Sequence, residues 1–298
     1  MRVYKSRGVI LELDGVKLCF DGSSKCNVGF ISHAHSDHLV SREVNHKFIT
    51  SNETKILSEY RTGFKLNHYS NNTFNGLNFK LIDNGHIFGS RALFIQGTES
   101  VLYTGDFSTR SRFFLNGFKP IKCDNLIIET TYGNPNYSFP DTKQVIKEAR
   151  DYIVDEFARG NNLVLKGYAL GKAQLISKLV EGCDNVYVDN RVLVFNDLCR
   201  SCGADLPFFK TGRLKGRFIL ISPEPRRDLK AKNVGFTGWA LNNWGGFDEC
   251  FPLSDHADFK DLLKVVKQCN PKRVFTHHGF AGEFAELLRL EGYDAAPL

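Results

Sequence analysis

The first 133 residues alternate short apolar runs with polar turns, a pattern typical of β-strands rather than of long helices. The runs 9–13 and 16–20 flank Asp14-Gly15, a dipeptide typical of a two-residue hairpin turn. Asn52 is expected to cap a short helix that ends at Tyr60. Further strands, arranged with the hairpin as a β-meander, are predicted at 28–31, 47–50, 79–82, 92–95, 100–103 and 125–128.

The pattern changes near Asn134, where two prolines mark a linker. Strand–helix alternation follows and predicts a small parallel, Rossmann-like unit, without the G-x-G-x-x-G motif of dinucleotide-binding proteins. The run 234–239 is expected to return the chain to the first sheet. The elements predicted after the linker are helices over 141–159, 172–180, 192–199 and 258–269 and strands over 162–165, 186–188, 217–221 and 273–276.

Three histidines and one aspartate follow the strand at 28–31 as the motif H-x-H-x-D-H, formed by His33, His35, Asp37 and His38. Because His33 and His35 are two residues apart, they face the same side of an extended backbone. Nitrogen and oxygen ligands of this kind suit Zn²⁺ at roughly 2.0–2.2 Å. Four candidate ligands here, with more downstream, indicate two metals. A histidine-rich surface loop is the alternative, and the tight spacing argues against it.

The other residues suited to site chemistry also stand at predicted strand ends or before a helix, and they are His86, Asp106, Glu129, His256 and His278. They lie on both sides of a middle segment that has almost none. We therefore expect one discontinuous domain, 1–133 and 252–298, interrupted by an inserted α/β domain at 134–251. Asp255 and Asp258 are expected to cap the following helix.

Composition is that of a soluble globular protein, with 42% hydrophobic and 24% charged residues among 298. No apolar run approaches the ~18 residues that cross a bilayer, and no signal peptide is recognisable at the start, so no membrane partner is expected. Eight scattered cysteines fit a reducing compartment, and we expect a cytoplasmic protein. Cys199 and Cys202 form one C-x-x-C, a weak zinc or redox signal whose role stays open.

The formal net charge of +6 is compatible with an anionic substrate. Basic residues gather at 213–217 and 226–232. These two groups fit either a solvated face or a rim that follows phosphates.

The ordered set of motifs resembles the β-CASP nucleases of the metallo-β-lactamase superfamily, a group that includes RNase J, the endonuclease of the mRNA 3′-end cleavage complex and Artemis. The C-terminal motifs look closest to short prokaryotic exonucleases, DNA-ligase-associated or of the mRNA 3′-end processing type. The matching motifs are F-I-S-H-A-H-S-D-H at 30–38, G-H-I-F-G-S at 85–90, T-G-D-F at 104–107, I-E-T-T-Y-G at 128–133, A-L-G-K-A-Q at 169–174, T-G-W-A at 237–240, L-S-D-H-A-D-F at 253–259 and H-H-G at 277–279.

The resemblance implies an αββα sandwich with an inserted, shortened β-CASP α/β domain. It implies that one zinc is held by His33, His35 and His86, and the second by Asp37, His38 and His278. Asp106 would bridge both ions, and Mn²⁺ is an expected substitute in vitro. The family pattern places the last ligand directly before glycine, which favours His278 over His277.

The resemblance also implies three catalytic residues, Asp37, Glu129 and His256. His256 would act as general acid for the leaving oxygen. Glu129 would orient the His256 ring and favour its charged form. The implied function is that of a two-zinc phosphodiesterase acting on single-stranded nucleic acid, as an exonuclease in RNA processing or DNA repair.

Two alternatives compete with this interpretation. A small-molecule metallo-hydrolase of the glyoxalase II or lactonase type shares H-x-H-x-D-H but lacks S-D-H-A-D and E-T-T-Y-G. A non-catalytic β-CASP scaffold usually loses ligands, and none is missing from this sequence. The sequence leaves open RNA or DNA, 5′ or 3′ polarity, and exo- or endonucleolytic cleavage. The sheet edges common to the fold also allow a homodimer.

Overall fold

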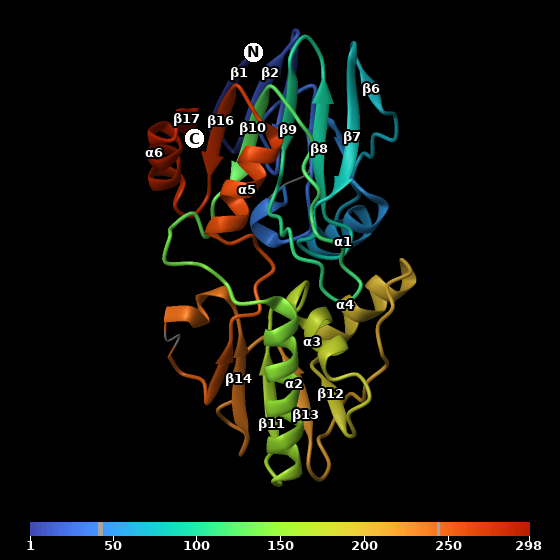
Figure 1. Ribbon diagram of the computed structural model, residues 1–298. Helices are drawn as coiled ribbons and strands as arrows, with labels where there is room; N and C mark the ends of the chain where they lie inside the picture. Colours follow the sequence, from blue (N-terminus) through green and yellow to red (C-terminus); the bar gives the residue numbers. More distant parts are fainter. Residues whose placement is uncertain (41–43, 243–244) are drawn as a thin grey trace. The chain divides into compact units, whose positions relative to one another are not determined.

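The computed structural model describes residues 1–40, 44–242 and 245–298, and the chain divides into two units (Figure 1). The first unit consists of Met1–Ser111, Asn116–Ser138 and His256–Leu298, and the second of Arg112–Leu115 and Phe139–Asp255. In the described residues, no helix is both long enough and apolar enough to span a membrane.

The first sheet of unit 1 has the strand order β1-β2-β3-β4-β5. The strands are β1 (Arg2–Ser6), β2 (Gly8–Leu13), β3 (Val16–Phe20), β4 (Val28–Phe30) and β5 (Lys47–Ile49). The predicted hairpin is present: β2 and β3 pair antiparallel, and Asp14 and Gly15 have φ of 49° and 77°, as a tight turn requires. The β-meander is wrong, because β3, β4 and β5 run parallel to one another.

The second sheet has the order β17-β16-β10-β9-β8-β7-β6 and joins the two ends of unit 1. The last two strands of the chain complete it, since β16 pairs parallel with β10 along its whole length. The strands are β6 (Thr73–Phe74), β7 (Leu77–Asp83), β8 (Arg91–Gln96), β9 (Ser100–Tyr103), β10 (Asn125–Glu129), β16 (Arg273–His277) and β17 (Asp294–Pro297).

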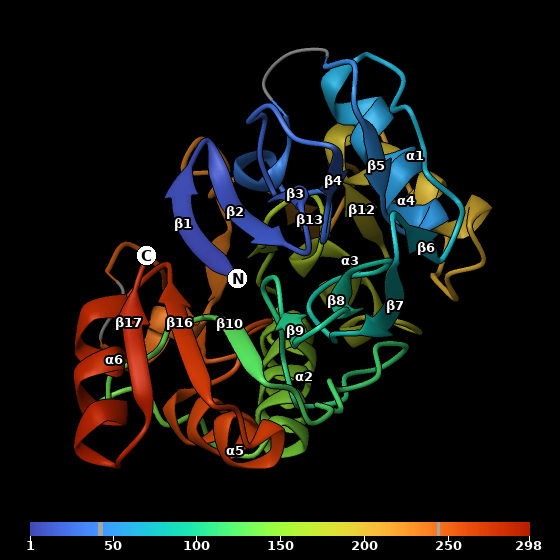
Figure 2. The ribbon, with the colours of Figure 1, turned by 90° about the horizontal axis from the view of Figure 1, so that it is seen from above.

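The two sheets pack face to face, and helices cover the outer face of the second sheet (Figure 2). One core lies between the sheets, where Leu11 and Phe20 of the first join Leu93 and Tyr103 of the second. Another core packs α5 (Phe259–Cys269) and α6 (Ala281–Leu290) against the second sheet. Burying one face of each sheet against another layer is what makes this arrangement stable. The predicted αββα sandwich is confirmed.

Helix starts follow local capping chemistry. Asp258 caps α5 by accepting a hydrogen bond from the backbone of Asp261, as expected. The cap of α1 (Asn52–Thr62) is Ser51, whose hydroxyl accepts from Thr54, so the prediction of Asn52 as the cap is wrong by one residue.

Unit 2 is built on a fully parallel sheet with the order β12-β13-β11-β14-β15. The predicted Rossmann-like unit is therefore present. The prediction that the run 234–239 returns to the first sheet is wrong, because β14 pairs with β11. The elements are α2 (Thr142–Ala158), β11 (Leu163–Lys166), α3 (Lys172–Leu179), β12 (Val186–Val188), α4 (Asn190–Ser201), β13 (Ile219–Ser222), β14 (Lys232–Phe236) and β15 (Glu249–Phe251).

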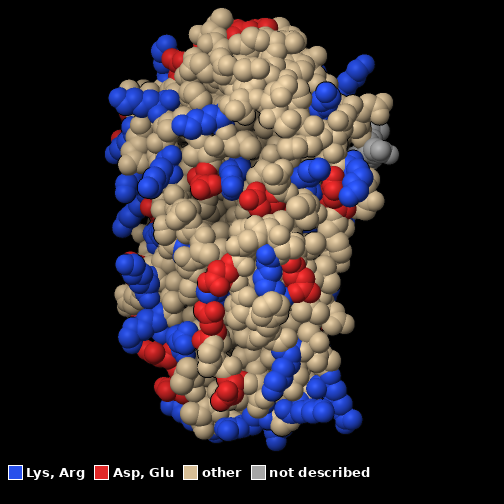
Figure 3. Space-filling model, turned by 90° about the vertical axis from the view of Figure 1, so that its right-hand side faces the viewer, with Lys and Arg blue, Asp and Glu red and all other residues tan. Residues whose placement is uncertain are grey.

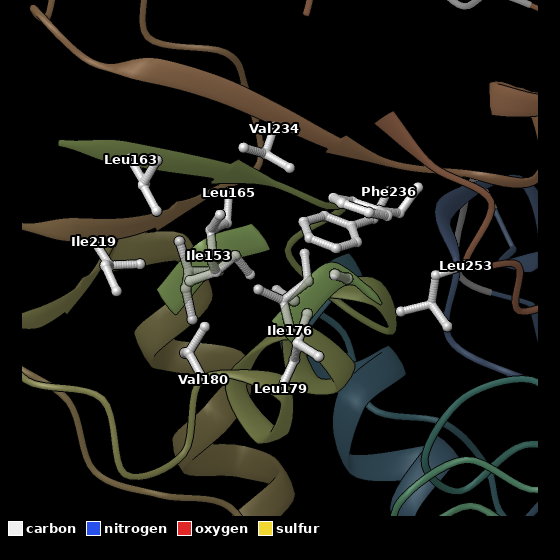
Figure 4. Packing of buried hydrophobic residues seen from close by; sticks show 14 of the residues in the cluster. Ile153, Leu163, Leu165, Ile176, Leu179, Val180, Ile219, Val234, Phe236 and Leu253 are labelled. Carbon is white, nitrogen blue, oxygen red and sulfur yellow. The ribbon is translucent and has the colours of Figure 1, made fainter. Parts of the chain in front are cut away.

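The core of unit 2 consists of mainly aliphatic side chains, together with Phe236 and Phe251, from the strands and from the helices that cover them (Figure 4). Leu163 and Leu165 of β11 pack with Ile153 of α2 and Ile176 of α3, all of them buried. The continuous apolar run of β11 is typical of a parallel strand that is covered on both faces. This core holds the strand ends, and the loops that follow them, in fixed positions.

Candidate metal centre

The H-x-H-x-D-H motif leaves the first sheet at the end of β4 and turns through a short 3₁₀ helix, Ser36–His38. His33 and His38 are buried, and His35 is half-buried. The side chain of Asp37 is 73% exposed, and its Oδ2 lies 3.7 Å from Nε2 of His38. The strand end and the turn place the ring centroids of His35 and His38 4.7 Å and 4.1 Å from that of His33.

The second sheet supplies two more of the predicted residues to the same point. His86 comes from the loop between β7 and β8, and Asp106 from the loop after β9. Each of His33, His35, His86 and Asp106 offers one ligand atom, and these atoms lie within 4.8 Å of one another. Nε2 of His86 is 3.1 Å from Nδ1 of His35, and Oδ2 of Asp106 is 3.6 Å from Nε2 of His33.

A second group shares Asp106 with the first. Its ligand atoms come from His38, Asp106 and His278, again within 4.8 Å of one another. Oδ2 of Asp106 lies 3.2 Å from Nε2 of His38, and the His278 ring stacks on the His38 ring at 5.3 Å. Asp106 is thus the one side chain common to both groups, which is the position of a bridging carboxylate.

The chemistry of these donors fits divalent metal ions. Nε2 of His33 is buried and makes no hydrogen bond within the described residues. Burial, followed by the neighbouring imidazoles, holds the pKa of His33 well below its ordinary value. A neutral imidazole with its lone pair aimed at a carboxylate and other imidazoles is a zinc donor, and soft-to-borderline nitrogen ligands favour Zn²⁺.

Asp21 is a residue of the site that sequence reasoning missed. Its Oδ2 lies 2.9 Å from Nδ1 of His38 and accepts hydrogen bonds from Tyr103 at 2.8 Å and from the Ser32 hydroxyl at 2.6 Å. Burial opposes the charged form of His38, but the carboxylates of Asp106 and Asp21 outweigh it and raise the His38 pKa well above its ordinary value. The signal in the sequence was an aspartate just after an apolar strand.

Asn84 was missed as well, and it joins the His86 loop to the Asp106 loop. Its side-chain amide donates to the carbonyls of Thr104 at 3.0 Å and Asp106 at 2.8 Å. Its side-chain oxygen accepts from the Ser90 hydroxyl at 2.5 Å and from the backbone of His86 at 3.3 Å. This fully buried amide fixes both ligand loops relative to each other.

Glu129 and His256 form a hydrogen-bonded pair beside the cluster. Glu129 ends β10 and is buried, and its Oε1 lies 3.0 Å from Nδ1 of His256. Its other oxygen accepts from the backbone of Thr131 at 2.8 Å. The rings of His256 and His86 are 4.6 Å apart, and ligand atoms of Asp106, Glu129 and His256 lie within 4.8 Å of one another. Within the described residues, eight of the nine predicted site residues thus fall into groups of close ligand atoms, and Asp37 belongs to none of these groups.

His277 and His278 occupy different environments. His278 has a positive φ of 60° after the end of β16 and faces His38. His277 is buried within the strand, and its ring stacks on Tyr103 at 5.5 Å. Within the described residues, His277 belongs to none of the groups of close ligand atoms. The geometry therefore favours His278 over His277 as the last ligand.

The residues before His256 are held inside unit 2. The buried ammonium of Lys172, from the A-L-G-K-A-Q motif, lies 3.1 Å from Asp255 and donates to the carbonyl of Leu253 at 2.5 Å. Arg112 donates to the carbonyl of Ser254 at 2.6 Å. The prediction that Asp255 caps α5 is therefore wrong: it is the ionic partner of Lys172, and Asp258 alone is the cap.

The C-x-x-C has no metal partners among the residues that the structure describes, where no group of three ligand residues includes Cys199 or Cys202. Cys199 is buried in α4, and Cys202 is its half-buried C-cap. All eight cysteines are free thiols.

Residues 249–296 match the family described as Zn-dependent metallo-hydrolase RNA specificity domain. The chain is 33% identical over 288 residues to the probable DNA ligase of Opitutus terrae, covering 89% of this chain and 28% of that protein. It is 29% identical to the probable RNase MJ4 of Methanocaldococcus jannaschii, covering 82% and 71%. It is 24% identical to the human DNA cross-link repair 1A protein, covering 84% and 28%. The chain thus spans under a third of the ligase and of the cross-link repair protein.

Among solved structures, the chain resembles a protein of unknown function from Enterococcus faecalis V583 with a TM-score of 0.62. The sequence identity is 15%, and the alignment covers 91% of this chain and 78% of that one. This likeness concerns the fold alone.

Proposed function

The chain belongs to the β-CASP group of the metallo-β-lactamase superfamily, and from this premise we propose that it is a two-zinc exonuclease that hydrolyses phosphodiester bonds in single-stranded RNA or DNA. The predicted family resemblance is confirmed. Relatives named as an RNase and a DNA repair protein support a metal-dependent hydrolase that acts on nucleic acids.

The observation that carries the proposal is the sharing of Asp106 between two groups of ligands, with the Glu129–His256 pair at the edge of the cluster. One group alone would fit many metallo-hydrolases. A carboxylate common to two groups supports two metal ions, and a positioned imidazole next to them supports proton transfer to a leaving oxygen.

The residues divide between the two ions as the family resemblance implies. His33, His35 and His86 would hold one ion; Asp37, His38 and His278 would hold the other; and Asp106 would contact both. When bound, two divalent ions in such a site orient an attacking water and neutralise the charge of an in-line displacement at phosphorus. Asp21 keeps Nε2 of His38 aimed at Asp106, which is the orientation that a ligand needs.

His256 is the proposed general acid. The carboxylate of Glu129 accepts the hydrogen bond of Nδ1, which leaves Nε2 to carry the proton that passes to the leaving oxygen. Burial of Glu129 and its hydrogen bond from Thr131 hold the carboxylate in place. Asp37 is exposed beside His38, and it would be the ligand of the second ion that faces solvent.

The charge of the surface is compatible with a nucleic-acid substrate but does not define a path for it. On the face drawn in Figure 3, Lys and Arg side chains are interspersed with Asp and Glu. Two basic residues of the 226–232 group form local ion pairs: Arg226 pairs with Asp228 at 2.6 Å and Lys232 with Glu156 at 2.5 Å. These pairs favour a solvated face for part of that region.

The proposal is tested by incubating the zinc- or manganese-loaded protein with single-stranded RNA and DNA of equal sequence, labelled at the 5′ or the 3′ end. A ladder that grows from one end gives sugar preference, polarity and cleavage mode together. Asp37→Ala and His38→Ala should abolish cleavage. The proposal is wrong if neither polymer is cut, or if both variants cut as the unaltered protein does. Turnover of thioesters or lactones in place of nucleic acid would instead indicate the small-molecule alternative.

A further inference from the structure

Tyr168 is an exposed aromatic residue that follows the central strand of unit 2. It comes two residues after Lys166, the last residue of β11, and it is 64% exposed. Tyr187 and Phe236 of unit 2, by contrast, are buried. An exposed ring at the end of a rigid strand is placed to bind a partner rather than to support the fold.

The loop that carries Tyr168 is fixed by hydrogen bonds at both ends. The amide of Gly167 donates to the carbonyl of Ser222 at 3.1 Å, which extends the pairing of β11 with β13 by one residue. The carbonyl of Tyr168 accepts from the amide of Ala173 in α3 at 3.0 Å. The side chain of Gln174 donates to the carbonyl of Ala169 at 3.0 Å. The ring is therefore presented from a preorganised backbone, which lowers the entropy lost on binding.

A cation accompanies the ring. Nζ of Lys166 lies 4.5 Å from the centroid of Tyr168, a cation–π distance. Because the ammonium covers one face, the other face is the one that can stack on a planar ligand. Burial lowers the pKa of Lys166 from its ordinary value, which marks the ammonium as partly withdrawn from water. A planar surface and a cation side by side match a nucleotide, which has a planar base and an anionic phosphate.

The place of Tyr168 in the sheet topology is that of a ligand site. The connection from β11 runs through α3 to β12 on one side, and the connection from β14 runs to β15 on the other side. β11 and β14 are parallel neighbours, so the connections that follow them leave towards opposite edges of the sheet. Open parallel sheets bind ligands outside the carboxyl ends of the strands at such a switch.

We propose that Tyr168 and Lys166 form a nucleotide subsite in unit 2, where the Tyr168 ring stacks on one base of a single-stranded substrate and Lys166 contacts an adjacent phosphate. Stacking on an aromatic face accepts every base, so this subsite adds affinity without sequence preference. The inference rests on the proposed function and adds a contact with the substrate that residues of unit 2 supply.

The test compares Tyr168→Ala, Tyr168→Phe and a control, Phe208→Ala, in the full chain loaded with zinc. Phe208 is also an exposed aromatic residue of unit 2, 83% exposed with Arg200 over its ring at 4.1 Å, but it precedes the segment that pairs with β12. Binding is measured by fluorescence anisotropy of labelled oligouridylate and oligothymidylate. Phosphorothioate linkages protect both oligonucleotides from cleavage during the measurement. Thermal unfolding checks that each variant is folded.

We expect Tyr168→Ala to weaken binding by about 5- to 100-fold, the range for one stacked base, and to raise KM more than it lowers kcat. Tyr168→Phe and Phe208→Ala should bind as the unaltered protein does. When 2-aminopurine occupies the position that stacks on the ring, its fluorescence should fall on binding to the unaltered protein and to Tyr168→Phe. It should not fall on binding to Tyr168→Ala. Lys166→Gln should lower the dependence of log affinity on log salt by about one unit.

The outcomes separate this inference from the function on which it rests. If the unaltered protein cleaves nucleic acid and Tyr168→Ala binds equally well, the subsite is wrong and the nuclease stands. If Tyr168→Phe loses as much affinity as Tyr168→Ala, the hydroxyl rather than the ring face makes the contact, and stacking is wrong. If the unaltered protein neither binds nor cleaves either polymer, both proposals are overturned.

Discussion

The carboxylate of Asp21 lies 2.9 Å from Nδ1 of His38, and on the other side of the same ring Nε2 lies 3.2 Å from Asp106. A carboxylate that accepts from one ring nitrogen fixes the tautomer and leaves the other nitrogen as a metal ligand. Asp21 would therefore act on the proposed metal centre through His38, as a positioning residue. The same carboxylate accepts hydrogen bonds from Tyr103 and Ser32, so its own orientation is fixed too.

The first prediction is that Asp21→Ala weakens the binding of one metal ion about 10- to 100-fold, the usual effect of losing such a partner. Zinc stoichiometry and affinity are measured by competition with a chelator. Tyr103→Phe is the matched control, because it removes one hydrogen bond to the same carboxylate and leaves the contact with His38. Unchanged affinity in Asp21→Ala would contradict the positioning role.

The second prediction separates the proton donor from the metal ligands. His256→Asn should lower kcat about 10²- to 10⁴-fold, the range for losing a general acid, while both metal ions stay bound. Glu129→Gln should give a smaller loss, because the amide oxygen still accepts from Nδ1. Asp106→Asn should lose activity together with bound zinc, because Asp106 belongs to both ligand groups. Metal content and single-turnover cleavage rates are measured on the same samples. Loss of zinc in His256→Asn would assign that residue to the metal instead.

The third prediction concerns the buried ion pair of unit 2. Nζ of Lys172 lies 3.1 Å from Asp255, and both side chains are largely removed from solvent. Removing one partner leaves a buried charge, so Lys172→Met and Asp255→Asn should each lower the free energy of unfolding by about 3 kcal/mol. The double variant should lose less than the sum of the two. Urea unfolding of the unaltered protein, the two single variants and the double variant completes a double-mutant cycle. Additive losses of unfolding free energy would show that the two side chains are not coupled.

How far the sequence predicts this protein depends on the range of the interactions. The hairpin at Asp14-Gly15 is local chemistry, and the H-x-H-x-D-H ligands are contiguous, so both are legible in the sequence. The sheet that β14 joins was not, because the partner of a parallel strand is chosen by a crossover and by burial on both faces. The strands β1 and β17 and the helix α6 were not predicted either.

Within the candidate site, the sequence pointed to side chains with donor atoms and not to the residues that hold them in place. His86 and Asp106 carry donor groups that the chemistry of zinc requires, and this makes them candidates from sequence alone. Asn84 acts through backbone carbonyls of Thr104 and Asp106, about twenty positions away, and nothing local in the sequence marks such bonds. Lys172 and Asp255 are 83 positions apart and become partners only in the folded unit.

The fourth prediction concerns the two cysteines of the C-x-x-C. Burial raises the pKa of the Cys199 thiol to about 12 from 9.0. Between these values the folded protein keeps a proton that the unfolded chain releases, so this contribution to stability falls as the pH rises from 9.0 towards 12. At pH 8–9, iodoacetamide should modify half-buried Cys202 and leave Cys199 intact, as read by peptide mass spectrometry. Both should react in denaturant, and equal labelling of the native protein would contradict the burial of Cys199.

The fifth prediction distinguishes the two histidines of H-H-G. His278 has a φ of 60°, a left-handed conformation that asparagine tolerates better than most residues, so His278→Asn removes the ring with little backbone strain. It should lose one metal ion and the cleavage activity. His277 is buried against Tyr103, and neither ring nitrogen has a hydrogen-bond partner within the described residues. His277→Phe keeps the stacked ring and removes two unsatisfied polar atoms, so it should bind both ions and unfold at the same or a higher temperature. Loss of metal from His277→Phe with retention in His278→Asn would reverse the assignment.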